Sequence, residues 1–168
     1  MQKINFEFFR VAPVLMFFLS ISFALAFKSI AWTFMFIGLT LNGILWGILT
    51  PYLSKKYPNA SERPNRSQCY FLYKKDPVSA GGLPSGHSQS AAFFSTWLVF
   101  LALHYRFNNP TLIVTFIIAL WLTIGMMISR VHDYQCHTTL QATTGSMIGI
   151  ITAVILWPIY LLVLQNIH

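Results

Sequence analysis

Three short polar clusters interrupt an otherwise apolar chain, and their residue types suit the binding and transfer of a phosphate group. The clusters are Lys56-x6-Arg63-Pro64, Pro84-Ser85-Gly86-His87-Ser88 and Ser129-Arg130-x6-His137. Together they supply fixed cations, two histidines and a glycine beside a serine. Ionisable groups at membrane depth are costly and are rarely kept for packing alone, so the clusters predict a functional site.

The second cluster has the composition of a helix start that can hold an anion. Ser85 suits an N-cap position, and Pro84 suits the same region of a helix. Gly86 allows the backbone to approach an anion closely, and the N–H groups and dipole of the first helical turn favour negative charge there. His87 would then lie beside the phosphate, where it can protonate a leaving oxygen. The alternative is an ordinary capped helix that carries an incidental histidine.

The cations of the other clusters match the charge of a phosphoryl group. Arg63 and Arg130 offer planar forks for two phosphate oxygens, whereas Lys56 offers a point charge. Such cations stabilise the charge on a phosphoryl group during its transfer. The alternative is that each is a basic flank of a membrane helix, as the positive-inside rule describes.

His137 has the chemistry of a nucleophile. A neutral imidazole can attack phosphorus and form a phosphohistidine, which water then hydrolyses. Its other ring nitrogen needs an acceptor, and the helical neighbour four residues on is Gln141. An amide orients the ring but cannot offset the positive charge that develops on it. Asp133 would supply that charge only if its loop folds back.

The composition predicts one all-α integral membrane domain over residues 1–168. The chain is 55% hydrophobic and only 9% charged, with a mean hydropathy of +0.59, whereas soluble domains carry about 25% charged residues. Alternating segments of about ten residues, which mark membrane β-barrels, are not seen. Nucleic acid is not an expected partner; the bilayer is.

Five apolar stretches approach the roughly 20 residues that a helix needs to cross a bilayer. They are Phe8–Phe27, Ile30–Tyr52, Ser85–His104, Thr111–Ile128 and Leu140–Leu164. We expect the first to be a retained helix rather than a cleaved signal peptide. The third begins with polar residues, so its start should lie in a cavity lined by protein or water. Five crossings place the three clusters on one face and the C-terminus on the other.

The distribution of charge favours one compartment for the site, whereas the two cysteines are compatible with either. Most Lys and Arg residues fall on the face of the clusters, and only Lys28 and Arg106 fall on the other, which the positive-inside rule interprets as a cytoplasmic site. Cys69 and Cys136 lie on the face of the clusters; they could pair in an oxidising compartment and would be free thiols in the cytosol. Two cysteines make no zinc signature, and no metal site is predicted.

Taken together, the three clusters resemble the signature of the type 2 phosphatidic acid phosphatase (PAP2) superfamily over about Ser54–Gly149. The first two motifs match without a gap. The third departs twice, because six residues separate Arg130 from His137 where the family has five, and Gln141 stands where the family usually has aspartate. Three ordered motifs in a membrane protein are a specific signal, although each alone is weak.

The resemblance implies a role for each residue of the clusters. Phosphate would be bound by Lys56, Arg63, Ser85, Gly86 and Arg130. His137 would be the nucleophile, His87 the general acid and Gln141 the orienting residue. No metal or other cofactor is expected, and the usual family core has six helices, one more than this chain shows.

The resemblance also suggests a substrate class, namely lipid phosphates or diphosphates. Glutamine at position 141 is similar to dolichyl diphosphate phosphatases, whereas the run from Ser129 to Tyr134 is similar to lipid phosphate phosphatases. We expect a polyisoprenyl diphosphate or a related lipid phosphate. In most lipid-acting relatives the site faces away from the cytosol, against the charge count, so the side of the membrane stays open.

Two other functions fit the residues. One is a phospholipid-binding protein that kept the pocket without turnover, which the altered spacing and Gln141 motivate. The other is a small transporter or channel with the basic cluster as an anion site; charges at helix ends rather than at the bilayer midplane argue against it. The sequence does not predict the oligomeric state.

Overall fold

The computed structural model describes residues 7–65 and 81–167, and these residues form helices and connections without a strand. The all-α prediction is therefore confirmed. The elements are α1 (Glu7–Phe27), α2 (Ile30–Lys56), α3 (Pro58–Ser61), α4 (Gly86–His104), α5 (Asn109–Ile128), the π-helical turn η2 (Ser129–Asp133) and α6 (Thr139–Ile167).

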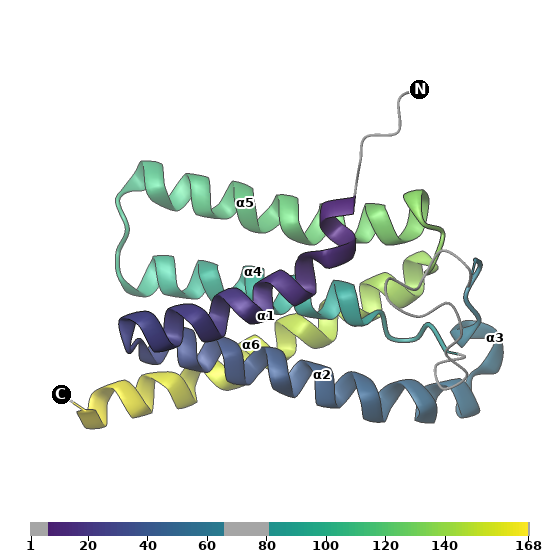
Figure 1. Ribbon diagram of the computed structural model, residues 1–168, viewed down its shortest axis with the longest axis horizontal. Helices are drawn as coiled ribbons and strands as arrows, with labels where there is room; N and C mark the ends of the chain where they lie inside the picture. The colour runs from purple at the N-terminus through teal and green to yellow at the C-terminus, as the bar shows by residue number, and fades with distance from the viewer. Residues whose placement is uncertain (1–6, 66–80, 168) are drawn as a thin grey trace.

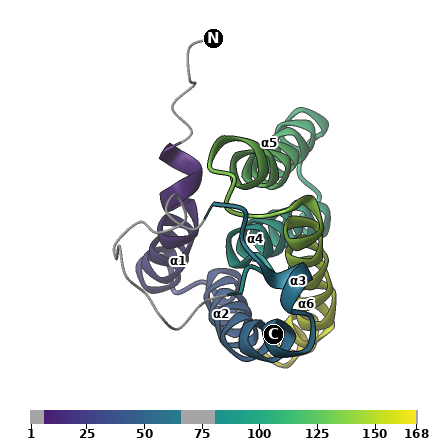
Figure 2. The same ribbon diagram turned by 90° about the vertical axis from the view of Figure 1, so that its right-hand side faces the viewer.

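Helix α4 lies in the middle of the bundle, and α1, α2, α5 and α6 pack around it (Figure 2). The four outer helices are long and apolar enough to cross a membrane, over Phe8–Phe27, Ile30–Lys56, Asn109–Asp133 and Thr139–Ile167. This confirms a multi-pass membrane protein. The predicted crossing Ser85–His104 is helical but less apolar, because a helix enclosed by other helices does not need an apolar surface toward lipid.

The outward surface of the bundle suits a lipid environment. Large apolar side chains stand on the outer helices, such as Leu25 at 73% exposure, Ile117 at 60% and Met147 at 62%. In water such a continuous apolar surface would drive aggregation, whereas in a bilayer it contacts acyl chains.

A polar cross-link inside the bundle ties α4 to α2 close to the clusters. The side-chain Nε2 of Gln89 donates to the Oδ1 of Asn42 at 2.8 Å and to its backbone carbonyl at 3.1 Å. Asn42 in turn donates to the carbonyl of Gly38 at 2.8 Å. Both side-chain amides are fully buried. Hydrogen bonds between membrane helices satisfy such polar groups where no water can reach them. The link lies within one turn of the start of α4.

The three clusters meet at one end of the bundle, as the five-crossing prediction required. The start of α4, the short helix α3 and the π-helical turn η2 gather at the right-hand end of Figure 1, and the C-terminus lies at the opposite end. Segments that are far apart in the sequence are thus placed around one membrane boundary.

A close approach of α6 fixes the start of α4. A Cβ at Gly145 would collide with the backbone carbonyl of Ser85, and the Ser85 amide donates to the Gln141 carbonyl at 3.0 Å. Only glycine therefore fits at position 145.

Gly145→Ala should destabilise the protein by about 1–3 kcal/mol, because overpacking forces backbone to move. Gly47→Ala is the matched control, since a Cβ at Gly47 meets no atom within 4 Å. Thermal unfolding of the purified protein in detergent measures both. Equal midpoints for the two variants would contradict the close packing of α6 on α4.

Candidate active site

The π-helical turn brings Arg130 and His137 together despite the additional residue between them. The amide of Tyr134 donates to the carbonyl of Ser129 at 3.0 Å, which is the i to i+5 pattern of a π-helix. A π-turn holds one residue more than an α-turn, so it accommodates the longer spacing. The amide of His137 then donates to the carbonyl of Arg130 at 3.2 Å.

The surroundings of His137 determine which ring nitrogen carries the proton. Nδ1 lies 3.0 Å from the carbonyl oxygen of Gly82 and 3.2 Å from the Oε1 of Gln141. Both oxygens can only accept, so Nδ1 must be protonated. Nε2 of the neutral ring therefore keeps its lone pair, which is the atom that a nucleophilic histidine uses.

The side-chain amide of Gln141 has a defined orientation, because both of its ends are engaged. Its Nε2 donates to the carbonyls of Ala60 and Glu62, each at 2.8 Å, and its Oε1 accepts from the amide of Thr138 at 3.2 Å. The oxygen therefore faces His137. Gln141 contacts His137, as its predicted orienting role requires, and it also connects His137 to the segment that leads into Arg63.

Arg63 and Arg130 are buried beside this histidine. Their exposed fractions are 8% and 1%, and the Nε of Arg63 donates to the carbonyl of Gly81 at 3.1 Å. With Nε held in this way, the two Nη groups of Arg63 form the part of the fork that suits two phosphate oxygens. Two buried guanidinium groups near one imidazole make a strongly electropositive cluster, which favours a dianion.

The start of α4 has the predicted capped geometry. Ser85 is the N-cap, and its Oγ accepts from the amide of Ser88 at 3.4 Å and from the hydroxyl of Ser88 at 3.2 Å. Gly86 begins the helix, so its amide belongs to the first turn, where backbone N–H groups favour an anion. The hydroxyl of Ser85 serves as the cap, and its contact with phosphate stays a prediction.

His87 lies close to the same cationic groups and contacts α1. Its Nε2 lies 3.2 Å from the carbonyl oxygen of Arg10, which can only accept, so Nε2 carries a proton. Arg130, His137 and Arg63 all act electrostatically on this imidazole. The two histidines therefore share one charged environment, as the convergence of the second and third clusters requires.

His137 lies between η2 and α6, outside the spanning helices, and its ring is neutral at physiological pH. Burial, and next the charges of Arg63 and Arg130, lower the pKa of His137 from 6.5 to about 3. The hydrogen bonds to Gln141 and Gly82 act in the opposite direction. The neutral form that nucleophilic attack requires is thus the resting form.

The predicted ligand Lys56 has a different setting from the two arginines. It is exposed at the end of α2, and its ammonium lies 5.8 Å and 5.4 Å from the ring centres of Tyr52 and Tyr57. These distances are typical of cation–π contacts. Its role as a phosphate ligand stays a prediction.

Two further expectations concern the loop that follows α5. Asp133 is exposed, and the oxygens that face His137 belong to Gly82 and Gln141 rather than to Asp133. Cys136 is fully buried, whereas Cys69 lies outside the described residues, so their pairing stays a prediction.

Sequence reasoning missed several groups that hold the site. Gly82 supplies a carbonyl to His137, and Arg10 supplies one to His87. Tyr134 lies beside the guanidinium of Arg130, 5.7 Å from ring centre to Cζ. Gly81 and Gly82 precede the second cluster, and this glycine pair was a signal by which Gly82 could have been found. The carbonyl of Arg10 had no such signal, because a backbone carbonyl on a distant helix leaves no mark in a sequence.

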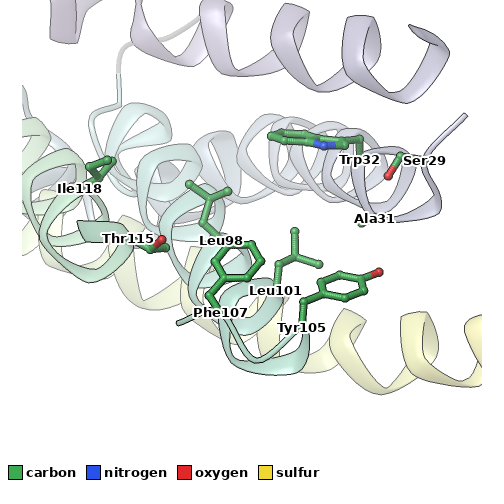
Figure 3. Close-up of a pocket in the computed structure, with 9 residues that line it drawn as sticks. All are labelled: Ser29, Ala31, Trp32, Leu98, Leu101, Tyr105, Phe107, Thr115 and Ile118. Carbon is green, nitrogen blue, oxygen red and sulfur yellow. The ribbon is translucent and has the colours of Figure 1, made fainter. Parts of the chain in front are cut away.

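A separate cavity of about 380 Å³ lies toward the opposite end of the bundle (Figure 3). It is lined mainly by apolar side chains, including Trp32, Leu98, Leu101 and Phe107, and by none of the predicted site residues. The cavity is therefore separate from the polar end where the predicted site residues meet.

The fold and the site define a helical membrane protein in which two buried arginines and two histidines gather at one membrane boundary. A family model described as the PAP2 superfamily matches residues 30–163, and the chain belongs to that superfamily. Comparisons with curated proteins and with solved structures gave no match. The family match does not distinguish a subtype, so the resemblance to dolichyl diphosphate phosphatases stays a prediction.

Gln141→Glu should destabilise the site by about 1–3 kcal/mol, because a carboxylate cannot donate to the Ala60 and Glu62 carbonyls. Gln135→Glu makes the same chemical change at an exposed position on the same face and serves as the control. Thermal unfolding at neutral pH compares them. A Gln141→Glu protein as stable as this control would contradict the double engagement of the amide.

The lowered pKa of His137 predicts how stability changes with pH. The unfolded chain takes up this proton near pH 6.5 and the folded protein only near pH 3, so the neutral ring contributes stability that is lost as the pH falls between these values. The loss from one such group is about 1.4 kcal/mol per pH unit. His137→Asn should therefore show a shallower loss of stability from pH 6 to pH 4, whereas exposed His132→Asn should follow the wild type. Parallel curves for all three proteins would be the contrary result.

Proposed function

We propose that this protein is a membrane lipid phosphatase that works through a phosphohistidine on His137. The observation that carries the proposal is the protonated Nδ1 of His137, which is held by Gly82 and Gln141 and leaves Nε2 as the nucleophilic atom. Membership of the PAP2 superfamily supports phosphatase chemistry.

The first chemical step transfers the phosphoryl group to the protein. Nε2 of His137 attacks phosphorus while the bond between phosphorus and the leaving oxygen breaks. In its doubly protonated form, His87 gives the proton on Nδ1 to that leaving oxygen and becomes neutral, while its Nε2–H stays on the carbonyl of Arg10. The product is a phosphohistidine and a free lipid alcohol, or a lipid monophosphate when the substrate is a diphosphate.

The second step releases phosphate. Neutral His87 removes a proton from water, and the water oxygen attacks phosphorus as the bond from phosphorus to Nε2 breaks. Both histidines then return to their starting protonation states. In each step Arg63, Arg130 and the first-turn N–H groups of α4 stabilise the charge on the three equatorial oxygens.

The position of the pocket supports a lipid substrate. The site stands at the ends of helices that cross the membrane, where the headgroup of a bilayer lipid meets water. A phosphate on such a lipid can reach Arg63 and Arg130 while its chain remains in hydrocarbon. We propose a lipid phosphate or diphosphate as the substrate.

One observation favours a second candidate, a protein that binds phospholipid without turnover. Gln141 carries no charge. It therefore cannot offset the positive charge that would develop on the His137 ring during attack on phosphorus. The oxygens of Gly82 and Gln141 both accept from Nδ1–H and so offset part of that charge through their dipoles, and we therefore favour catalysis.

His137→Ala should abolish phosphate release from a lipid phosphate in the presence of a metal chelator, and His87→Ala should lower it by about 10²–10⁴-fold. His132→Ala removes an exposed histidine from the same face and should behave as the wild type. The wild type should also form a phosphoenzyme that is labile in acid and stable in alkali.

Full activity of His137→Ala would exclude this nucleophile. A wild-type protein that binds the lipid phosphate and releases nothing would favour the binding protein instead.

A further inference from the structure

One face of α2 brings Trp46 to the first turn of α4. Asn42, one turn earlier on α2, accepts the hydrogen bond from Gln89 that links the two helices. Residues four apart on a helix lie on the same face, so the link that fixes Asn42 against α4 also directs Trp46 toward that helix. The residue of α4 that Trp46 meets is Gly86.

The contact between Trp46 and Gly86 involves the edge of the indole that carries the N–H group. A Cβ at Gly86 would lie 3.1 Å from Cδ1 and 3.1 Å from Nε1 of Trp46. The indole donor is therefore next to the first residue of α4. The backbone N–H groups that favour an anion belong to this same turn.

The indole N–H of Trp46 is a buried donor without a hydrogen-bond partner among residues 7–65 and 81–167. An indole can only donate, and a tryptophan N–H that is buried ordinarily finds an acceptor. The Trp46 ring is partly exposed, yet its Nε1 is covered by other atoms. A donor that is withdrawn from the surroundings and left unpaired destabilises the unliganded protein, and an acceptor supplied by a ligand would remove that cost.

We propose that Trp46 is a phosphate-binding residue whose indole N–H donates to an oxygen of the anion bound at the start of α4. The inference deepens the proposed function, because it concerns the same phosphate site. An oxygen that accepts from the first-turn N–H groups at Gly86 also stands next to Nε1 of Trp46. The indole is then satisfied when phosphate is bound.

Trp46 contributes something that the two arginines do not. Arg63 and Arg130 supply charge, whereas the indole supplies a neutral donor on a rigid ring with only two side-chain torsions. Because the Asn42–Gln89 link holds α2 against α4, the direction of this donor is set before the anion arrives. A donor that is organised in advance stabilises a phosphate oxygen without the cost of rearrangement.

An NMR titration of the isotope-labelled protein in detergent tests the contact directly, with inorganic phosphate as the probe. The chain has five tryptophans, and the indole N–H signal that is absent from Trp46→Phe belongs to Trp46. That signal should move downfield and saturate as phosphate is added at constant ionic strength. The signal of Trp121, a 53% exposed residue of α5, should stay in place. If Trp46→Phe does not fold, Trp46→Tyr provides the assignment.

Thermal unfolding over a series of phosphate concentrations gives the Kd of each variant. Trp46→Phe keeps an aromatic ring and removes the donor, so it should raise the Kd by about 10–100-fold, the effect of one lost hydrogen bond to a charged group. Trp121→Phe makes the same change away from the site and should keep the wild-type Kd.

A shifted Trp46 signal together with the weaker binding of Trp46→Phe supports the proposal. A Trp46 signal that does not respond to phosphate overturns it, as does an unchanged Kd or a wild type that binds no phosphate. Release of phosphate from a lipid phosphate tests the proposed function separately. A wild type that binds phosphate through Trp46 and hydrolyses nothing would make turnover wrong and leave the contact standing. A wild type that hydrolyses the lipid while the Trp46 signal stays in place would make only the role of Trp46 wrong.

Discussion

The hydrogen bonds at Nδ1 of His137 are the constraint on which the rest of the site depends. Two oxygens that can only accept, from Gly82 and Gln141, place the proton on this nitrogen. Burial and two arginines keep the ring neutral, so Nε2 keeps its lone pair beside two cationic side chains, as the proposed nucleophile requires. A ring of the opposite tautomer would present an N–H to phosphorus and could not attack it.

The bundle provides this setting through the unusual composition of its central helix. Because α4 is enclosed by α1, α2, α5 and α6, it can carry a polar first turn into the membrane protein without exposing that turn to lipid. The Gln89–Asn42 link and the close approach at Gly145 then hold the start of α4 against α2 and α6. The packing of the helices and the geometry of the candidate site thus depend on the same few contacts at one end of α4.

The amide of Gln141 shows how a residue that departs from the family pattern fits this chain. An aspartate would supply charge to His137 but could not donate a hydrogen bond. Glutamine donates to the carbonyls of Ala60 and Glu62 while its oxygen faces the histidine. One side chain therefore positions both the segment before Arg63 and His137, which charge alone would not achieve.

The sequence by itself determined the membrane class, the helices and most of the residues of the pocket, because apolar length and motif spacing are local properties of the chain. It also predicted the meeting of Arg63, His87 and His137 at one face, because five crossings alternate between two faces. Only the tertiary structure decided that a π-turn absorbs the longer spacing after Arg130. The carbonyls of Gly82 and Arg10 likewise emerged only from the fold, since every residue has a carbonyl and only packing decides which one a distant histidine meets.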